Sequence, residues 1–185
     1  MVKQDDIDSL NVDLPESGKD HYVDAFMHVS DKKNKNFKVK LRYRGDNNFH
    51  WLFKQKSLRI KLSEDDSYNM SKIINLINPP MLMQITDVIS YEIAKELGLI
   101  SPEYYPVRMF VNGEYMGVYL FLSQVDESLL RIHKIMPGSI YYGESSPVNE
   151  NGIFDLFFKQ QFWQNKGARN KETKNLRDDI SYYIE

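Results

Sequence analysis

Alternating apolar and polar positions mark the strands in the first part of the chain. Residues 37–43 alternate apolar with basic side chains, and residues 56–62 place Leu58, Ile60 and Leu62 on one face. Such period-two alternation predicts half-buried β-strands. We expect a further short strand within residues 21–30, and a short apolar segment follows at residues 73–77.

The pattern changes to helical spacing and then to a hairpin. Pro79 and Pro80 suit the first turn of a helix running to Leu97, and Gly98 is placed to cap its C-terminus. Residues 107–111 and 115–122 flank Asn112-Gly113, which predicts a two-residue type I′ hairpin. Strands around one helix predict an α+β fold.

The remaining segments are less regular. Residues 1–20 are polar and acidic, which predicts a loose lead-in. After a connector at 123–126, we expect a helix at 127–135, a strand at 139–142 and helical structure over the aromatic residues 153–164. The final apolar positions have helical spacing but no cap or stop signal, so we expect this chain to be a piece of a longer protein. They are Leu176, Ile180 and Ile184.

Charge is balanced overall but divided locally. The 185 residues carry a net charge of −2, yet residues 1–31 hold eight acidic and two basic side chains and residues 32–61 hold eleven basic and one acidic. The balance predicts no nucleic-acid partner, and no apolar run approaches the roughly 20 residues of a membrane span. The chain has no cysteine, and its acidic first residues do not show the basic-then-apolar pattern of a signal peptide. This favours a cytoplasmic location and leaves association with the cell surface open.

Lys56 is the first candidate for chemistry. It shares parity with Leu58 and Ile60, so it points towards the apolar face of its strand, where a lysine must find a partner or reach water. One interpretation is the strand lysine of a kinase, which pairs with nucleotide phosphates and a helix glutamate. The alternative is a lysine that extends into solvent at the end of the strand.

Two carboxylates on the predicted helix could serve as that partner. At about 100° per residue, Glu92 and Glu96 fall within the apolar arc of the helix, where a carboxylate is costly unless it is paired. Either one could alternatively lie at the edge of the arc in contact with water. The arc consists of Met81, Ile85, Val88, Ile89, Ile93 and Leu97.

A basic stripe lies on the strand face opposite the core. Our default interpretation is a solvated sheet face, although the stripe could bind an acidic or phosphorylated partner. The aromatic residues Phe49, Trp51 and Phe53 could stack on nucleic acid, but aromatic residues in a loop more often cover a core. The stripe consists of Lys38, Lys40, Arg42, Arg44, Arg59 and Lys61. The histidines lack the spacing of a metal site.

Several segments together resemble the CotH (spore-coat-protein-H-like) kinase family, N-terminal part. Residues 41–45 and 53–60, LRYRG and FKQKSLRI, are similar to its RG…KKS segment, and residues 96–99, ELGL, resemble its helix end. The hairpin NGEYMGVYL at residues 112–120 and Val125-Asp126-Glu127 are the most specific matches.

The resemblance implies an atypical protein-kinase-like small lobe, an antiparallel sheet plus one helix, at residues 20–122. A hinge would follow at 123–127, and the start of a helical large lobe at 128–185. It further implies ATP, Mg²⁺ or Mn²⁺, and transfer of phosphate to serine or threonine of a protein substrate.

Residue roles follow from the same resemblance. Lys56 would contact the phosphates and Glu92 or Glu96 would be its helix partner. The backbone at Gln124 would meet the adenine, with Asp126 near the ribose, and Arg44 would lie near any phosphate held by the turn that follows it.

The family's catalytic aspartate, in an Asn-aromatic-Asp-Gly setting, and its later metal-binding aspartate have no counterpart in this sequence. Asp155, Asp178 and Asp179 lack that context. Because phosphoryl transfer depends on metal ions and a positioned hydroxyl, we expect little or no activity from this chain. The rival hypothesis is a non-catalytic binding or assembly module of the same fold, associated with a cell surface or coat.

Overall fold

The computed structural model describes residues 1–12, 14, 21–31, 34–45, 48–78, 83–136, 138–143 and 163–165. The chain divides into two compact units, Met1–Gln124 and Val125–Glu185, and each is described by itself below. The predicted boundaries at 20, 122 and 127 stay predictions.

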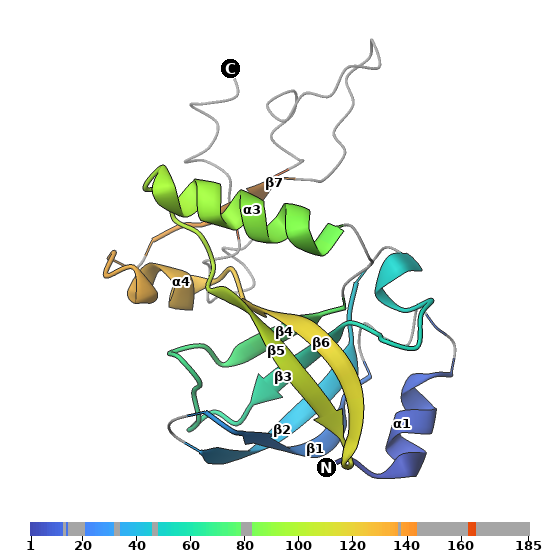
Figure 1. Ribbon diagram of the computed structural model, residues 1–185. Helices are drawn as coiled ribbons and strands as arrows, with labels where there is room; N and C mark the ends of the chain where they lie inside the picture. Colours follow the sequence, from blue (N-terminus) through green and yellow to red (C-terminus); the bar gives the residue numbers. More distant parts are fainter. Residues whose placement is uncertain are drawn as a thin grey trace. The chain divides into compact units, whose positions relative to one another are not determined.

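A six-stranded antiparallel sheet dominates the first unit (Figure 1). Its strands lie in the order β1-β2-β3-β4-β6-β5, so only β5 and β6 depart from chain order. The α+β prediction is therefore correct. The strands are β1 (Val23–Val29), β2 (Lys35–Tyr43), β3 (Leu58–Leu62), β4 (Ile73–Ile77), β5 (Tyr104–Val111) and β6 (Glu114–Ser123).

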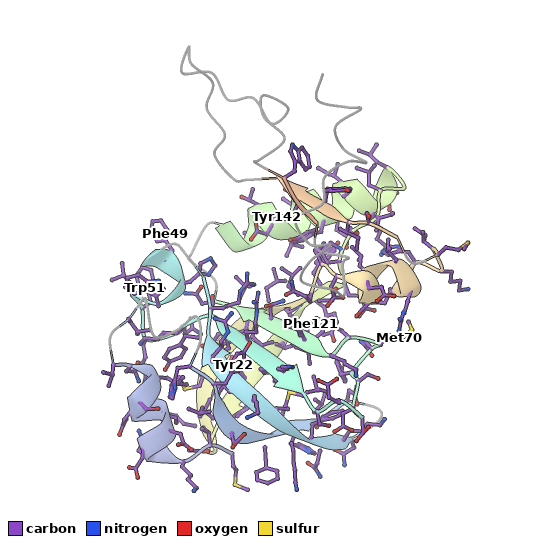
Figure 2. All side chains as sticks on the ribbon, turned by 180° about the vertical axis from the view of Figure 1, so that it is seen from behind. Tyr22, Phe49, Trp51, Met70, Phe121 and Tyr142 are labelled. Carbon is purple, nitrogen blue, oxygen red and sulfur yellow. The ribbon has the colours of Figure 1, made fainter. Side chains whose placement is uncertain are left out.

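One face of this sheet carries the apolar core, as the alternation predicted. Leu58, Ile60 and Leu62 of β3 are all buried, and Phe121 in β6 packs on the ring of Tyr105 in β5. Figure 2 shows Phe121 within the sheet. Since these side chains share one face, the alternate positions of every strand form a second face, which we call the outer face. The buried core consists of Phe37, Val39, Leu58, Ile60, Leu62, Tyr68, Ile74, Leu76, Tyr119 and Phe121.

The N-terminus is part of the fold, so the prediction of a loose lead-in was wrong for the first residues. Helix α1 (Gln4–Leu10) buries Leu10, and Val2 bridges to Ala25 of β1. The backbone of Val2 also bonds to the Asn112 side chain in the β5–β6 turn, through N–H···O at 3.0 Å and O···H–N at 2.8 Å. The first two residues thus connect the edge strand β1 to the hairpin tip (Figure 1).

Turn and cap chemistry set the hairpin and the helix as expected. Asn112 has φ 50° and Gly113 has φ 90°, as a type I′ turn requires. Gly98, with φ 71°, caps the C-terminus of helix α3 (Met83–Glu96). The Gly98 and Leu99 N–H groups donate to the carbonyls of Lys95 and Ala94, which is a Schellman motif. The predicted helix start at Pro79 and Pro80 lies outside the described residues.

Helix α3 meets the sheet with a different side from the one predicted. Tyr91 stacks on Tyr104 of β5 at 4.9 Å between ring centroids, whereas Ile89 and Ile93 are 51% and 54% exposed. Ile85 and Leu97 are also exposed. The predicted apolar arc therefore points away from the sheet, because an aromatic contact holds the opposite side of the helix. Met81 lies outside the described residues.

A buried polar cluster holds the segment between β2 and β3. Ser57 is fully buried and donates from its hydroxyl to Asn78 Oδ1 at 2.7 Å. The Asn78 amide donates to the carbonyls of Phe49 and Gln55 at 2.7 and 2.9 Å, next to the short 3₁₀ helix η1 (Asn48–His50). Figure 2 shows Phe49 projecting from this segment, where Trp51 also lies.

The described part of the second unit contains helix α4 (Glu127–Ile132) and the strand pair β7 (Tyr141–Gly143) and β8 (Trp163–Asn165). The helix and the strand were predicted at 127–135 and 139–142. The helical prediction for 153–164 was wrong at Trp163 and Gln164, which pair with β7, and its other residues lie outside the described part. No helix among the described residues has the length and apolar character to cross a bilayer.

Candidate functional site

A row of side chains crosses the outer face of the sheet from β2 to β5. Directly paired positions in neighbouring antiparallel strands place their side chains on one face. The pairs Arg42–Arg59, Arg59–Asn75, Asn75–Leu122 and Leu122–Tyr104 therefore define one continuous row, which we call the outer row. It passes from two guanidinium groups through an amide to an apolar and an aromatic side chain.

Hydrogen bonds fix the centre of the outer row. Arg59 Nε donates to Asn75 Oδ1 at 3.0 Å, and Arg59 Nη2 lies 3.4 Å from Gln124 Oε1. The Asn75 amide donates to the same Gln124 oxygen at 3.1 Å and to the Leu122 carbonyl at 3.3 Å. Because Asn75 uses both ends of its amide, it orients the guanidinium and the Gln124 side chain together.

The outer face is only partly the solvated surface that we predicted. Lys38, Lys40 and Lys61 are exposed, as expected for a solvated stripe. Arg42, however, is 9% exposed. Its Cζ lies 5.3 Å from the centroid of the Tyr22 ring, and its Nη1 donates to the Tyr43 carbonyl at 3.0 Å. Arg59 is half-buried. The prediction was wrong for these two arginines because side chains around the outer row remove them from water.

Helix α3 meets the outer face at the β5 end of this row. Tyr104 stacks on Tyr91, and burial, followed by the neighbouring Glu92 carboxylate, raises the pKa of Tyr104 to about 12. A phenol that loses hydration, and lies beside a negative charge, resists ionisation. Glu92 therefore lies near Tyr104, although its own side chain is exposed.

Lys56 lies on the other face of the sheet. It precedes β3, which begins at Leu58, and its ammonium is 5.7 Å from the centroid of Tyr43, a residue packed against the core. Its hydrogen bond is to the Phe53 carbonyl at 3.4 Å. Within the described residues it forms no ion pair with Glu92 or Glu96, both of which are exposed.

The other predicted site residues have structural contacts of their own. The Arg44 N–H donates to the Ser57 carbonyl at 3.0 Å, which continues the β2–β3 pairing. In the second unit, Asp126 is the N-cap of α4, because its Oδ1 accepts from the Ser128 N–H at 2.8 Å. Of the predicted set, Gln124 joins the hydrogen-bond network of the outer row, and the nucleotide roles of all six residues stay predictions.

Sequence reasoning missed Asn75, Arg59 and Tyr104. Asn75 was visible as the one polar residue inside the apolar strand Ile73–Ile77, where an amide requires a buried partner. Arg59 was recognised as part of the basic stripe, whose default interpretation was a solvated face, with an acidic or phosphorylated partner as the alternative. Across the described residues, no group of three or more His, Asp or Glu side chains could hold a metal ion.

Comparison with known proteins identifies the family. Residues 41–185 match the family described as CotH kinase protein. This chain belongs to the CotH family. The inner spore coat protein H of Bacillus subtilis (strain 168) is 31% identical to it over 151 residues. That match covers 78% of this chain but 40% of the relative, so the chain spans less than half the length of this CotH protein.

The family assignment confirms the resemblance in the sequence. The match begins at Leu41, in β2, and includes the outer-row residues from Arg42 onward. The outer row therefore lies within the region that matches the family, whereas α1 and β1 precede it.

Proposed function

We propose that this chain is the N-terminal nucleotide-binding portion of a CotH-like atypical protein kinase. The complete protein would transfer the γ-phosphate of ATP to a serine or threonine hydroxyl of a protein substrate, with Mg²⁺ or Mn²⁺. The outer row carries this proposal. It combines guanidinium groups with an amide network that reaches Gln124, the residue following β6.

The arrangement of the first unit supports the same proposal. Helix α3 approaches one face of an antiparallel sheet, and that face bears the basic side chains. Fixed donors directed at phosphate oxygens are the main contribution of protein to phosphoryl transfer. In the proposed function, Arg59 and Gln124 belong to the nucleotide site, while Lys56, Glu92, Glu96, Arg44 and Asp126 keep the roles implied by the resemblance.

Thermal unfolding in the presence of ATP tests the proposal. A ligand at a hundredfold excess over its Kd stabilises the folded state by about 2.7 kcal/mol, so ATP should raise the Tm of this chain measurably. Sodium sulfate at matched ionic strength controls for general anion effects. A folded sample whose Tm is the same in millimolar ATP and in sulfate would contradict the proposal. In a phosphate-transfer assay, we expect little or no transfer by this chain.

A second function, protein binding without catalysis, is favoured by the exposed side of α3. Ile85, Ile89, Ile93 and Leu97 recur every four residues and are all more than half exposed. Contiguous exposed apolar surface is typical of protein–protein contacts. Together with the name of the relative, it supports a coat-associated location for this chain. Binding of a partner that Ile93→Glu abolishes, with no ATP-dependent rise in Tm, would favour this function over the kinase.

A further inference from the structure

We propose that the open edge of β5 binds an extended segment of a partner protein, which adds to the sheet as a further strand. The segment would alternate apolar and acidic side chains and place a carboxylate opposite Arg108. This inference goes beyond the proposed function, because it concerns a surface that needs no nucleotide. β5 is the last strand in the order of the sheet, so its side away from β6 pairs with no described strand.

The backbone of β5 shows which polar groups this edge offers. The Ser123 N–H donates to the Glu103 carbonyl at 2.9 Å, so the backbone of Glu103 faces β6. Because successive residues of a strand face opposite sides, the backbone groups of residues 104, 106, 108 and 110 face away from β6. Pro106 occupies one of these positions, where its missing N–H costs no hydrogen bond in the sheet. Arg108 and Phe110 each offer an N–H and a C=O group there.

Two contacts limit the open part of this edge. At one end of β5, Tyr104 stacks on Tyr91 of α3. At the other end, the Asn112 side chain bonds to the backbone of Val2. Figure 1 shows α3 and the N-terminus near opposite ends of the β5–β6 hairpin. The open stretch is therefore residues 106–110, which suits an added strand of about five residues, a common strand length.

The side chains on the outer face beside this stretch are exposed and include a cation. Arg108 is exposed and forms no hydrogen bond or ion pair within the part of the chain that the structure describes. Its cross-strand neighbour Val118 is 41% exposed. Phe110 is 61% exposed and lies 5.2 Å from Tyr115 between ring centroids. Arginine and aromatic side chains are enriched among the residues that contribute most to protein–protein binding.

The core face of β5 is incompletely covered at the same edge. Val107 and Met109 pack against the core but are only half-buried. An added strand would place one set of alternate side chains beside them and the other set beside Arg108 and Phe110. Apolar side chains suit the first set, and a carboxylate suits the position opposite the Arg108 guanidinium. These requirements define the alternation of the proposed segment.

The charge of β5 argues against a second copy of this chain as the occupant. Like charges directly opposite each other on neighbouring strands destabilise a sheet. Arg108 lies in the open stretch, and β5 carries no acidic side chain from Tyr104 to Val111. A β5–β5 pair centred on Arg108 would therefore bring two guanidinium groups together.

Titration of a synthetic peptide into the ¹⁵N-labelled chain tests the proposal by NMR. The probe is an acetylated and amidated peptide of about seven residues that alternates valine and aspartate, the usual length of a short strand. We expect the largest amide shifts at Arg108 and Phe110. Arg108→Gln should weaken binding about two- to fivefold, the cost of an opposite-charge cross-strand pair. Lys38→Gln is the matched control, because Lys38 is an exposed cation on the outer face of β2, and it should leave the affinity unchanged.

Methylation of the peptide backbone distinguishes strand addition from contact by side chains alone. Alternate N–H groups of an extended peptide face the sheet, so methylating one alternating set should abolish binding and methylating the other should not. Equal effects of the two sets would overturn the proposal. So would the absence of binding at millimolar peptide, or equal affinities of the unaltered chain and Arg108→Gln. In sedimentation of the chain alone, a dimer that Arg108→Gln strengthens would show that a second copy occupies the edge, which would also overturn it.

Discussion

Replacing Asn78 with alanine should destabilise the first unit more than any single hydrogen bond would suggest. The side chain is 2% exposed and bonds to the Ser57 hydroxyl and to the carbonyls of Phe49 and Gln55. The substitution removes the donor from those part-buried carbonyls and the acceptor from the buried Ser57 hydroxyl, at about 1–3 kcal/mol for each group left unsatisfied. We therefore expect a loss of about 3–5 kcal/mol, a large part of the typical stability of a domain.

Urea unfolding measures this loss. In a Trp163→Phe background, Trp51 is the remaining tryptophan of the two and lies next to His50, whose Nδ1 is 2.9 Å from Ser57 Oγ. The fluorescence of Trp51 therefore reports on the segment between β2 and β3, which the Ser57 and Asn78 side chains hold. Asn36→Ala is the control, since Asn36 is exposed, and should cost less than about 0.5 kcal/mol.

A double-mutant cycle locates the source of the effect. Ser57→Ala and Asn78→Ala remove the same hydrogen bond, so the double variant should be less destabilised than the sum by about 1 kcal/mol. An Asn78→Ala loss below about 1 kcal/mol with an unchanged m-value would show that this cluster does not hold the segment, and the reasoning would be wrong.

Two further predictions follow from single positions. Gly117 has φ 108°, and a Cβ added there would lie 1.8 Å from Gln55 Nε2, which donates to the Met116 carbonyl. Gly117→Ala should therefore cost about 1–3 kcal/mol in urea unfolding. Gly113→Ala, at φ 90° with no atom within 4 Å, should cost less, and equal losses would argue against the Gln55 contact. Burial, followed by the neighbouring Glu92 carboxylate, raises the pKa of Tyr104 from 10.0 to about 12. The free energy of unfolding should therefore stay constant with respect to this group below pH 10 and fall between pH 10 and 12. The difference in tyrosinate absorbance between the unaltered chain and Tyr104→Phe should show this pKa. Glu92→Gln should lower the Tyr104 pKa only in part, because burial is the larger cause. An ordinary tyrosine pKa in the unaltered chain would contradict the placement of Glu92.

Local signals in the sequence predicted the parts of the fold that depend on local chemistry. The Asn112-Gly113 turn and the Gly98 cap require left-handed backbone, which few residues adopt, so these boundaries were readable. The alternation in β3 was also predicted correctly, because a half-buried strand must present one apolar face. The kinase-like assignment depended on the resemblance, and both the kinase-like fold and its catalytic function are proposals.

The side of a helix that meets a sheet is not a local property, and the sequence alone predicted it wrongly. A helical wheel locates an apolar arc but does not say what the arc touches. In α3 the stacked pair Tyr91–Tyr104 contacts the sheet, so Ile89 and Ile93 face outward. Parity has the same limitation for Lys56 and Arg59, because it separates the two faces of β3 without showing which face the helix approaches.

The two faces of β3 place distinct requirements on adjacent residues. Leu58 and Ile60 are buried in the core, while Arg59 between them bonds to Asn75 on the outer face. A shift of β3 by one residue would bury the guanidinium in the core and expose both apolar side chains, which is prohibitively costly. The apolar core therefore fixes the register that brings Arg59 beside Arg42 and Gln124. The proposed nucleotide site, which includes Arg59 and Gln124, therefore depends on the packing of the opposite face of the sheet. Variants of Ile60 should alter ATP binding only when they also alter the free energy of unfolding.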